Sequence, residues 1–223
     1  MDLLIENFLN VEILAVAWPM LWIGLKTTLL LTAAAVPLGL LGGLLIAMLR
    51  SLGLRWLNAL LIVFVDFFRS FPPLVLLIFV YYGLPFLGVE AEPFISVVIA
   101  LTLNTSSYYG EIFRAGIESI PRGQMEAARS TGLGRMQAMR HVIVPQAVRN
   151  VLPDLVGNTV EVIKSTSTAS VVAFPELLRM ARIAQGNLYN PTPLIAAALI
   201  YLVLLWPAVR LLSRMERRML AAR

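Results

Sequence analysis

The sequence predicts an all-α protein that crosses a membrane several times. Its 223 residues are 59% hydrophobic and 14% charged, with a mean hydropathy of +0.81, whereas ordinary soluble domains are about 45–50% apolar. The apolar residues gather into five runs, each long enough to cross a hydrocarbon core of about 30 Å as a helix. We therefore expect a single transmembrane domain over residues 1–223.

The first expected span covers residues 27–49, which carry no charge. Gly39 and Gly43 form a small-xxx-small pair inside it, and such a pair permits another helix to pack closely. The preceding residues are acidic and lead to no short apolar run with a small-residue cleavage site, so we expect no removed signal peptide.

The second expected span covers residues 56–83 and is longer than one membrane thickness. The pair Pro72-Pro73 interrupts it, so we expect a kink. Asp66 and Arg69 lie three residues apart on one helix face, and we expect a structural ion pair between them.

The remaining expected spans cover residues 93–113, 148–172 and 188–209. The third span is less apolar than its neighbours, so its polar side should face protein or water, not lipid. Residues 175–186, between the last two spans, predict a short amphipathic helix that ends at Gly186. This helix either contacts a soluble partner outside the cell or lies on the bilayer surface.

The orientation follows from the distribution of Lys and Arg. Residues 50–55, residues 114–149 and the C-terminal tail are basic, whereas the N-terminus and residues 84–92 contain only acids. We expect the N-terminus outside and the C-terminus inside. Arg179 and Arg182, in the loop after the fourth span, run against this assignment.

A charged, Gly-punctuated island separates the third and fourth spans. Pro121 suits the start of a helix, and Gly132 suits the left-handed residue that ends it. A second short helix is expected from about Arg135, stopping near Pro145. This island, residues 119–145, is either an ordinary solvated helical hairpin or a docking surface that another protein approaches closely over its small residues.

Two polar stripes at helical spacing predict a water-filled path through the membrane. The stripe on the third span contains Asn104, Tyr108 and Glu111, and the stripe on the fourth contains Asn158, Glu161, Ser165 and Thr168. An ionised carboxylate near mid-membrane needs a partner. Glu161 either pairs with Lys164, three residues on, or accepts the ammonium group of an amino-acid substrate.

Several function classes are excluded or left without support. The chain has no cysteine, and His141 is its only histidine, so we expect no metal site. The basic residues lie beside apolar runs, as the positive-inside rule predicts, and do not indicate a nucleic-acid partner. The phosphate-binding motif G-x-x-x-x-G-K-[ST] and any catalytic constellation are missing, so we expect no enzyme.

The island resembles the EAA loop of ATP-binding-cassette (ABC) importer permeases. The resemblance rests on Gly123, Gln124, Glu126, Ala127 and Ala128, followed by Gly132 and Gly134 and then by residues 142–147. Further matches are similar to the polar amino-acid branch of these permeases. They are Phe68-Arg69-x-x-Pro72, Tyr82-Gly83-Leu84-Pro85, Arg149, Leu152-Pro153 and Lys164-x-Thr166-Ser167.

The resemblance implies a type I importer permease in a bacterial inner membrane. Its expected partners are cytoplasmic ABC ATPase subunits, a second identical or related permease, a solute-binding protein and membrane lipid. ATP and Mg²⁺ would belong to the ATPase, and this chain would bind no cofactor. Contacts to the ATPase are expected from the island residues Gly123, Gln124, Glu126, Ala127, Ala128, Gly132 and Arg135.

The resemblance implies that the transported solute is a polar or charged amino acid or a related amine- or opine-like solute, and leaves its identity open. Ser165, Thr168 and the pair Ser70-Phe71 depart from the usual pattern of the family. Two alternatives belong to other classes. One is an ion-driven secondary carrier with Glu161 or Asp154 as its ion site, and the other is a purely structural membrane subunit.

Overall fold

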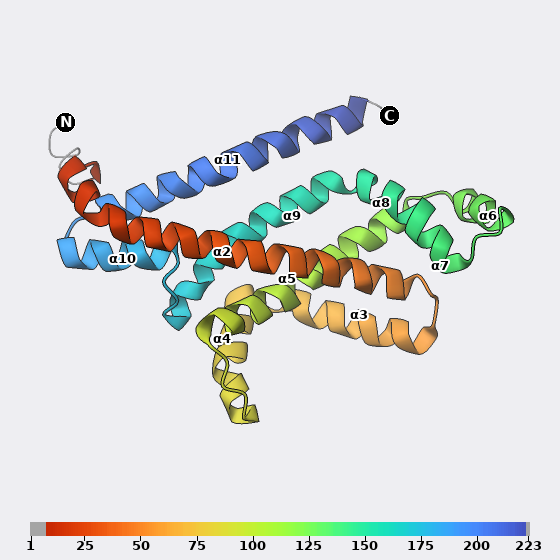
Figure 1. The fold of residues 1–223 in the computed structure, drawn as a ribbon, viewed down its shortest axis with the longest axis horizontal. Coiled ribbons are helices and arrows are strands. Elements are labelled where there is room, and N and C mark those ends of the chain that lie inside the picture. Colours follow the sequence, from red (N-terminus) through yellow and green to blue (C-terminus); the bar gives the residue numbers. More distant parts are fainter. Residues whose placement is uncertain (1–7, 222–223) are drawn as a thin grey trace.

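The computed structural model describes residues 8–221, with side chains up to residue 217, and all regular elements in that range are helical (Figure 1). The elements are α2 (Val11–Arg50), α3 (Arg55–Ser70), α4 (Pro73–Gly83), a 3-10 turn (Leu84–Leu87), α5 (Pro93–Glu118), α6 (Arg122–Ser130), α7 (Arg135–Ala138), a π-helical turn (Met139–Ile143), α8 (Val144–Asn150), α9 (Leu152–Ser165), a second 3-10 turn (Thr166–Val172), α10 (Leu177–Leu188) and α11 (Thr192–Ala221). The all-α prediction is confirmed.

Helix α2 runs along the long axis of the molecule (Figure 1). It begins at Val11, well before the expected first residue 27, because Asn10 caps it by accepting hydrogen bonds from the amides of Glu12 and Ile13. The charged residue Lys26 lies inside the helix and does not interrupt it. Its side chain is exposed and lies over the Trp22 ring. At about 1.5 Å per residue, its 40 residues are about 60 Å long.

Two hydrophobic clusters form on α2. Its C-terminal half packs on α5, where the cluster includes Leu31, Ala35 and Tyr109, and its N-terminal half packs on α10 and α11 through Ala17 and Leu21. The predicted close approach at Gly39 and Gly43 is confirmed. A Cβ atom added at Gly43 would lie 2.5 Å from the Cβ of Tyr109.

The expected second span is broken rather than gently kinked. Helices α3 and α4 meet at an angle of 104°. Phe71 takes an extended conformation, as expected for a residue that precedes proline. The predicted ion pair between Asp66 and Arg69 is wrong, since within the described chain Arg69 lies 4.0 Å from Glu111 instead.

Length and hydropathy alone identify α2 and residues 192–217 of α11 as helices able to cross a membrane, and the bent α3–α4 pair as a third such segment. Helices α5 and α9 carry more polar residues, so the five spans and their orientation remain predictions. Some of the terminal charges used for the orientation, those of Asp2, Glu6, Arg218 and Arg223, lie outside the described side chains.

The island forms two short helices around Gly132, which is left-handed with φ 89° and ends α6 as predicted. Helix α7 begins at Arg135, also as predicted. The expected stop at Pro145 is wrong, because a π-helical turn leads directly into α8. Pro145 occupies the first turn of α8, where an N–H group needs no intrahelical acceptor.

The fourth expected span is also divided, into the end of α8, helix α9 and the second 3-10 turn. The short helix expected after it is present as α10. Gly186 lies inside α10 and does not end it. Tyr189, with φ 48°, is the left-handed residue that follows.

Candidate functional site

The island lies at one end of the long axis, and α10 lies at the other (Figure 1). Most of its predicted contact residues are exposed and therefore accessible to a partner, namely Gly123, Gln124, Glu126, Ala127 and Gly132. Ala128 is an exception, because it is only 7% exposed and packs inward.

Arg135 is exposed, but its guanidinium turns back toward the membrane part of the chain. Its Nη2 donates a 2.6 Å hydrogen bond to the carbonyl oxygen of Ser51, in the turn between α2 and α3. The island is therefore connected to a distant part of the sequence.

The two predicted polar stripes face each other across a cavity of about 250 Å³. Helices α4, α5 and α9 provide its lining residues, which are Pro73, Asn104, Thr105, Tyr108, Asn158, Glu161, Val162 and Ser165. Five of the six residues predicted for the substrate path are thus brought together. Thr168 is not among them, because the chain changes from α-helix to 3-10 helix at Thr166 and the helical spacing is lost.

Asn104 and Tyr108 are held by the end of α3. The Nδ2 of Asn104 donates a 3.0 Å hydrogen bond to the carbonyl of Phe68, and the hydroxyl of Tyr108 donates a 3.4 Å bond to the carbonyl of Arg69. The Arg69 guanidinium lies over the Tyr108 ring, 5.2 Å from its centre. The α5 side of the cavity is therefore fixed to α3.

On the α9 side of the cavity, the two residues with the strongest polar groups are Asn158 and Glu161. The Nδ2 of Asn158 is buried, and the Asn158 side chain interacts with the hydroxyl of Tyr109. Glu161 accepts a 2.6 Å hydrogen bond from Lys164, so the predicted pairing is present, and both side chains are more than half exposed. This side presents one carboxylate that a solute can reach.

Glu111 lies outside the cavity, contrary to the stripe in which the sequence placed it. Its carboxylate contacts Arg50 of α2, Arg69 of α3 and Arg114 of α5, the last at 2.8 Å. Only the Glu111–Arg114 pair, three residues apart on α5, could be expected from the sequence, because Arg50 and Glu111 are 61 residues apart.

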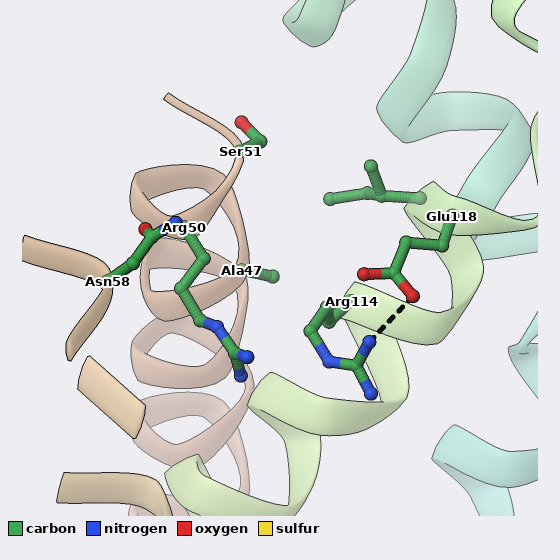
Figure 2. A pocket seen from close by; sticks show the side chains of 7 residues that line it. Ala47, Arg50, Ser51, Asn58, Arg114 and Glu118 are labelled. Atoms are coloured by element: carbon green, nitrogen blue, oxygen red, sulfur yellow. Dashed lines mark hydrogen bonds and ion pairs between the residues drawn. The ribbon is translucent and has the colours of Figure 1, made fainter. Parts of the chain in front are cut away.

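A second, smaller cavity of about 150 Å³ lies beside this cluster, between α2, α3 and α5. Figure 2 shows Arg50 on α2 and Arg114 on α5, with their side chains directed into the space between the two helices. Arg114 also binds Glu118, at 2.6 Å. Ion pairs between charged side chains therefore join α2, α3 and α5 in this region.

Glu176 is a buried carboxylate at the start of α10 that sequence reasoning did not single out. Its oxygens accept hydrogen bonds from the amides of Leu178 and Arg179 and from the hydroxyl of Tyr201 on α11. Burial raises the pKa of Glu176, and these hydrogen bonds and the charge of Arg182 oppose that rise.

No group of three or more His, Cys, Asp or Glu side chains that could hold a metal ion occurs among residues 8–217.

Comparison with known proteins gives a consistent result. The family described as "binding-protein-dependent transport system inner membrane component" matches residues 35–221. A probable amino-acid ABC transporter permease of Bacillus subtilis, YckA, is 35% identical over 88% of this chain and 87% of its own. The glutamine transport system permease GlnP of Escherichia coli K12 is 34% identical over 91% of this chain and 94% of its own.

Two solved structures share the fold. The chain superimposes on an amino acid ABC transporter crystallised with histidines at a TM-score of 0.79, with 39% identity and coverage of 90% of this chain and 94% of that one. The inward-facing MetNI methionine transporter gives a TM-score of 0.70 at 20% identity, covering 89% and 95% of the two chains.

Proposed function

The chain belongs to the family of binding-protein-dependent transport system inner membrane components, and on that premise we propose how it carries out amino-acid import. It is a permease subunit of an ABC importer for amino acids and a multi-pass membrane protein. The family supports the bacterial inner membrane as its location.

The proposed assembly contains two permeases, either identical or related, two ATPase subunits and a solute-binding protein. The exposed island residues Glu126 and Gly132 would contact the ATPase, which would hold ATP and Mg²⁺. The opposite end of the molecule, around α10, would receive the binding protein. The separation of island and α10 along the long axis supports this division (Figure 1).

The observation that carries the substrate proposal is the polar cavity between α5 and α9. An amino acid carries an ammonium and a carboxylate group. The Glu161 carboxylate can accept from the ammonium group, and the hydroxyl group of Ser165 can donate to the carboxylate. The cavity therefore offers one polar partner for each end of an amino acid.

Lys164 competes with the substrate for Glu161. The pair is exposed, and an exposed ion pair contributes only about 0–1 kcal/mol. A cationic group entering the cavity can therefore replace Lys164 at little cost. In this proposal Lys164 neutralises Glu161 while the cavity holds no substrate.

The test is reconstitution of the permease with its neighbouring ATPase and binding-protein gene products in proteoliposomes. Uptake of a panel of radiolabelled amino acids is measured with and without ATP inside the vesicles, and with and without the binding protein. We expect uptake only when both are present. Uptake driven by an ion gradient without ATP would overturn the proposal in favour of a secondary carrier.

A further inference from the structure

A continuous set of contacts joins the island to the cavity. We propose that Glu111 and Arg135 are positioning residues that transmit movement of the island to the substrate cavity. This inference rests on the proposed function, because the ATPase is what would move the island. Neither residue touches the cavity itself.

The first link joins the island to the turn between α2 and α3. Arg135 donates to the carbonyl of Ser51, which caps the C-terminus of α2. Only a few residues separate Ser51 from the start of α3 at Arg55, and Gly53 among them is left-handed with φ 75°. A displacement of Arg135 therefore acts directly on a short connection between two long helices.

The second link is Glu111, which binds the residue next to Ser51. One carboxylate oxygen contacts Arg50, and the other contacts Arg69 and Arg114. The Glu111 side chain is only 20% exposed, so these charges are less screened by water than surface charges are. Without the carboxylate, three guanidinium groups from three helices would repel one another.

The third link reaches the cavity wall. Glu111 lies one helical turn from Tyr108, and Arg69 contacts both of them. Arg69 lies in the last turn of α3, directly before the 104° bend into α4, whose Pro73 lines the cavity. A shift of Arg50 or Glu111 relative to α3 must therefore change the position of Tyr108, of Pro73 or of both.

Glu118 provides a matched control on the same helix. It pairs with Arg114 alone, and its side chain is 63% exposed. Replacing Glu118 by Gln removes one carboxylate from the same charged region but breaks no contact to α2 or α3. Contiguous contacts become evidence of transmission only when perturbing them changes the response at the far site.

The experiment uses a thiol placed in the cavity of the complete importer. The chain has no cysteine, so Ser165→Cys introduces a single reactive thiol in the permease. Its alkylation rate by a small methanethiosulfonate reagent is measured with and without the ATP analogue AMP-PNP. AMP-PNP should change this rate in the Ser165→Cys parent, and the same change should persist with Glu118→Gln.

With Glu111→Gln or Arg135→Met added, the change in alkylation rate should be lost while AMP-PNP binding remains, because the Met side chain has no donor for the Ser51 carbonyl. Arg135→Lys should restore it, because an ammonium group can also donate to the Ser51 carbonyl. The double variant should respond no differently from either single variant, since both break one path. Arg135→Met leaves the charged cluster intact and serves where Glu111→Gln fails to assemble.

Two results would overturn the inference. One is a normal AMP-PNP response in both the Glu111→Gln and the Arg135→Met variants. The other is a parent that imports amino acids with ATP yet shows no AMP-PNP response in the cavity. Failure of the proposed function gives a different result, namely the absence of ATP-dependent uptake by the unaltered importer.

Discussion

The amide of Asn104 supplies the hydrogen-bond donor that Pro72 lacks. In a continuous helix the carbonyl of Phe68 would accept from the N–H four residues later, which is residue 72, but proline has no N–H. The Nδ2 of Asn104 binds that carbonyl instead, at 3.0 Å. Tyr108 does the same for Arg69, whose partner would be Pro73. Two cavity residues thus complete the broken end of α3.

Asn104→Asp should destabilise the protein, because a carboxylate cannot donate to the Phe68 carbonyl. An unsatisfied buried group costs about 1–3 kcal/mol. Asn158→Asp is the matched control, since Asn158 lines the same cavity from α9 and does not hold the end of α3. We expect a lower melting temperature in detergent for Asn104→Asp only, and altered uptake with little change in melting temperature for Asn158→Asp. A lower melting temperature for Asn158→Asp only, with altered uptake for Asn104→Asp, would make Asn158 the structural residue and Asn104 the transport residue.

Glu161→Gln should weaken uptake or change the preferred solute without disturbing assembly, because it keeps the shape of the side chain and removes its charge. The ion pair with Lys164 is exposed, so stability should change by less than about 1 kcal/mol. Uptake kinetics over a panel of amino acids measure the effect. Unchanged kinetics for every transported solute would make Glu161 a structural residue.

Glu126→Lys and Gly132→Val should separate ATP hydrolysis from uptake. Glu126 is exposed on α6, and reversing its charge should weaken the contact with the ATPase. Gly132 has open space around it but is left-handed, so a β-branched side chain costs about 1–2 kcal/mol of backbone strain. Both variants should insert into the membrane normally. Normal uptake together with normal binding-protein-stimulated ATPase activity would contradict this prediction.

Gly43→Ala and Gly186→Ala should have opposite effects on stability. At Gly43 the added methyl group meets Tyr109 and the amide nitrogen of Gly110 at 2.5 and 2.7 Å, and such overpacking costs about 1–3 kcal/mol. At Gly186, inside α10, nothing lies within 4 Å, and alanine favours the helix by about 1 kcal/mol. Thermal unfolding in one detergent tests both. Equal shifts would show that α2 and α5 can move apart freely.

Stability should depend on pH through Glu176. Because burial raises the pKa of Glu176 in the folded protein above its ordinary value of 4.5, the stabilising contribution is complete below pH 4.5 and is lost as pH rises through the folded pKa. Glu176→Gln should remove this component. The check is the melting temperature of both proteins across that pH window, where their difference should grow in favour of the variant as pH rises. A constant difference would mean that Glu176 does not titrate there.

Local sequence patterns were sufficient for the all-α class, the position of the bend and the helix end in the island. Gly132 is predicted to be left-handed from its position, and Pro72-Pro73 predicts a kink where the structure has a 104° bend. The pairing of charges was not predictable in the same way. Arg69 has an acid three residues before it, but folding brings Glu111 to it from another helix.

The lining residues of the cavity were predictable only where the chain keeps the regular spacing of an α-helix. Asn158, Glu161 and Ser165 follow that period, and Thr168 does not, because the 3-10 turn begins at Thr166. The helix end predicted at Pro145 is wrong for a related reason. A proline stops a helix only when it falls beyond the first turn, and the π-helical turn before it allowed α8 to begin there.

The length of α2 also determines when its contacts can form during synthesis. The main partner of its C-terminal half, α5, is complete at Glu118, whereas the partners of its N-terminal half, α10 and α11, begin only at Leu177 and Thr192. The Thr28 hydroxyl, for example, accepts from the amide of Leu177, 149 residues later. A nascent chain that has left the ribosome as far as α9 therefore carries half of α2 without its protein partners, and those apolar residues must rest against lipid or a chaperone until translation is nearly finished.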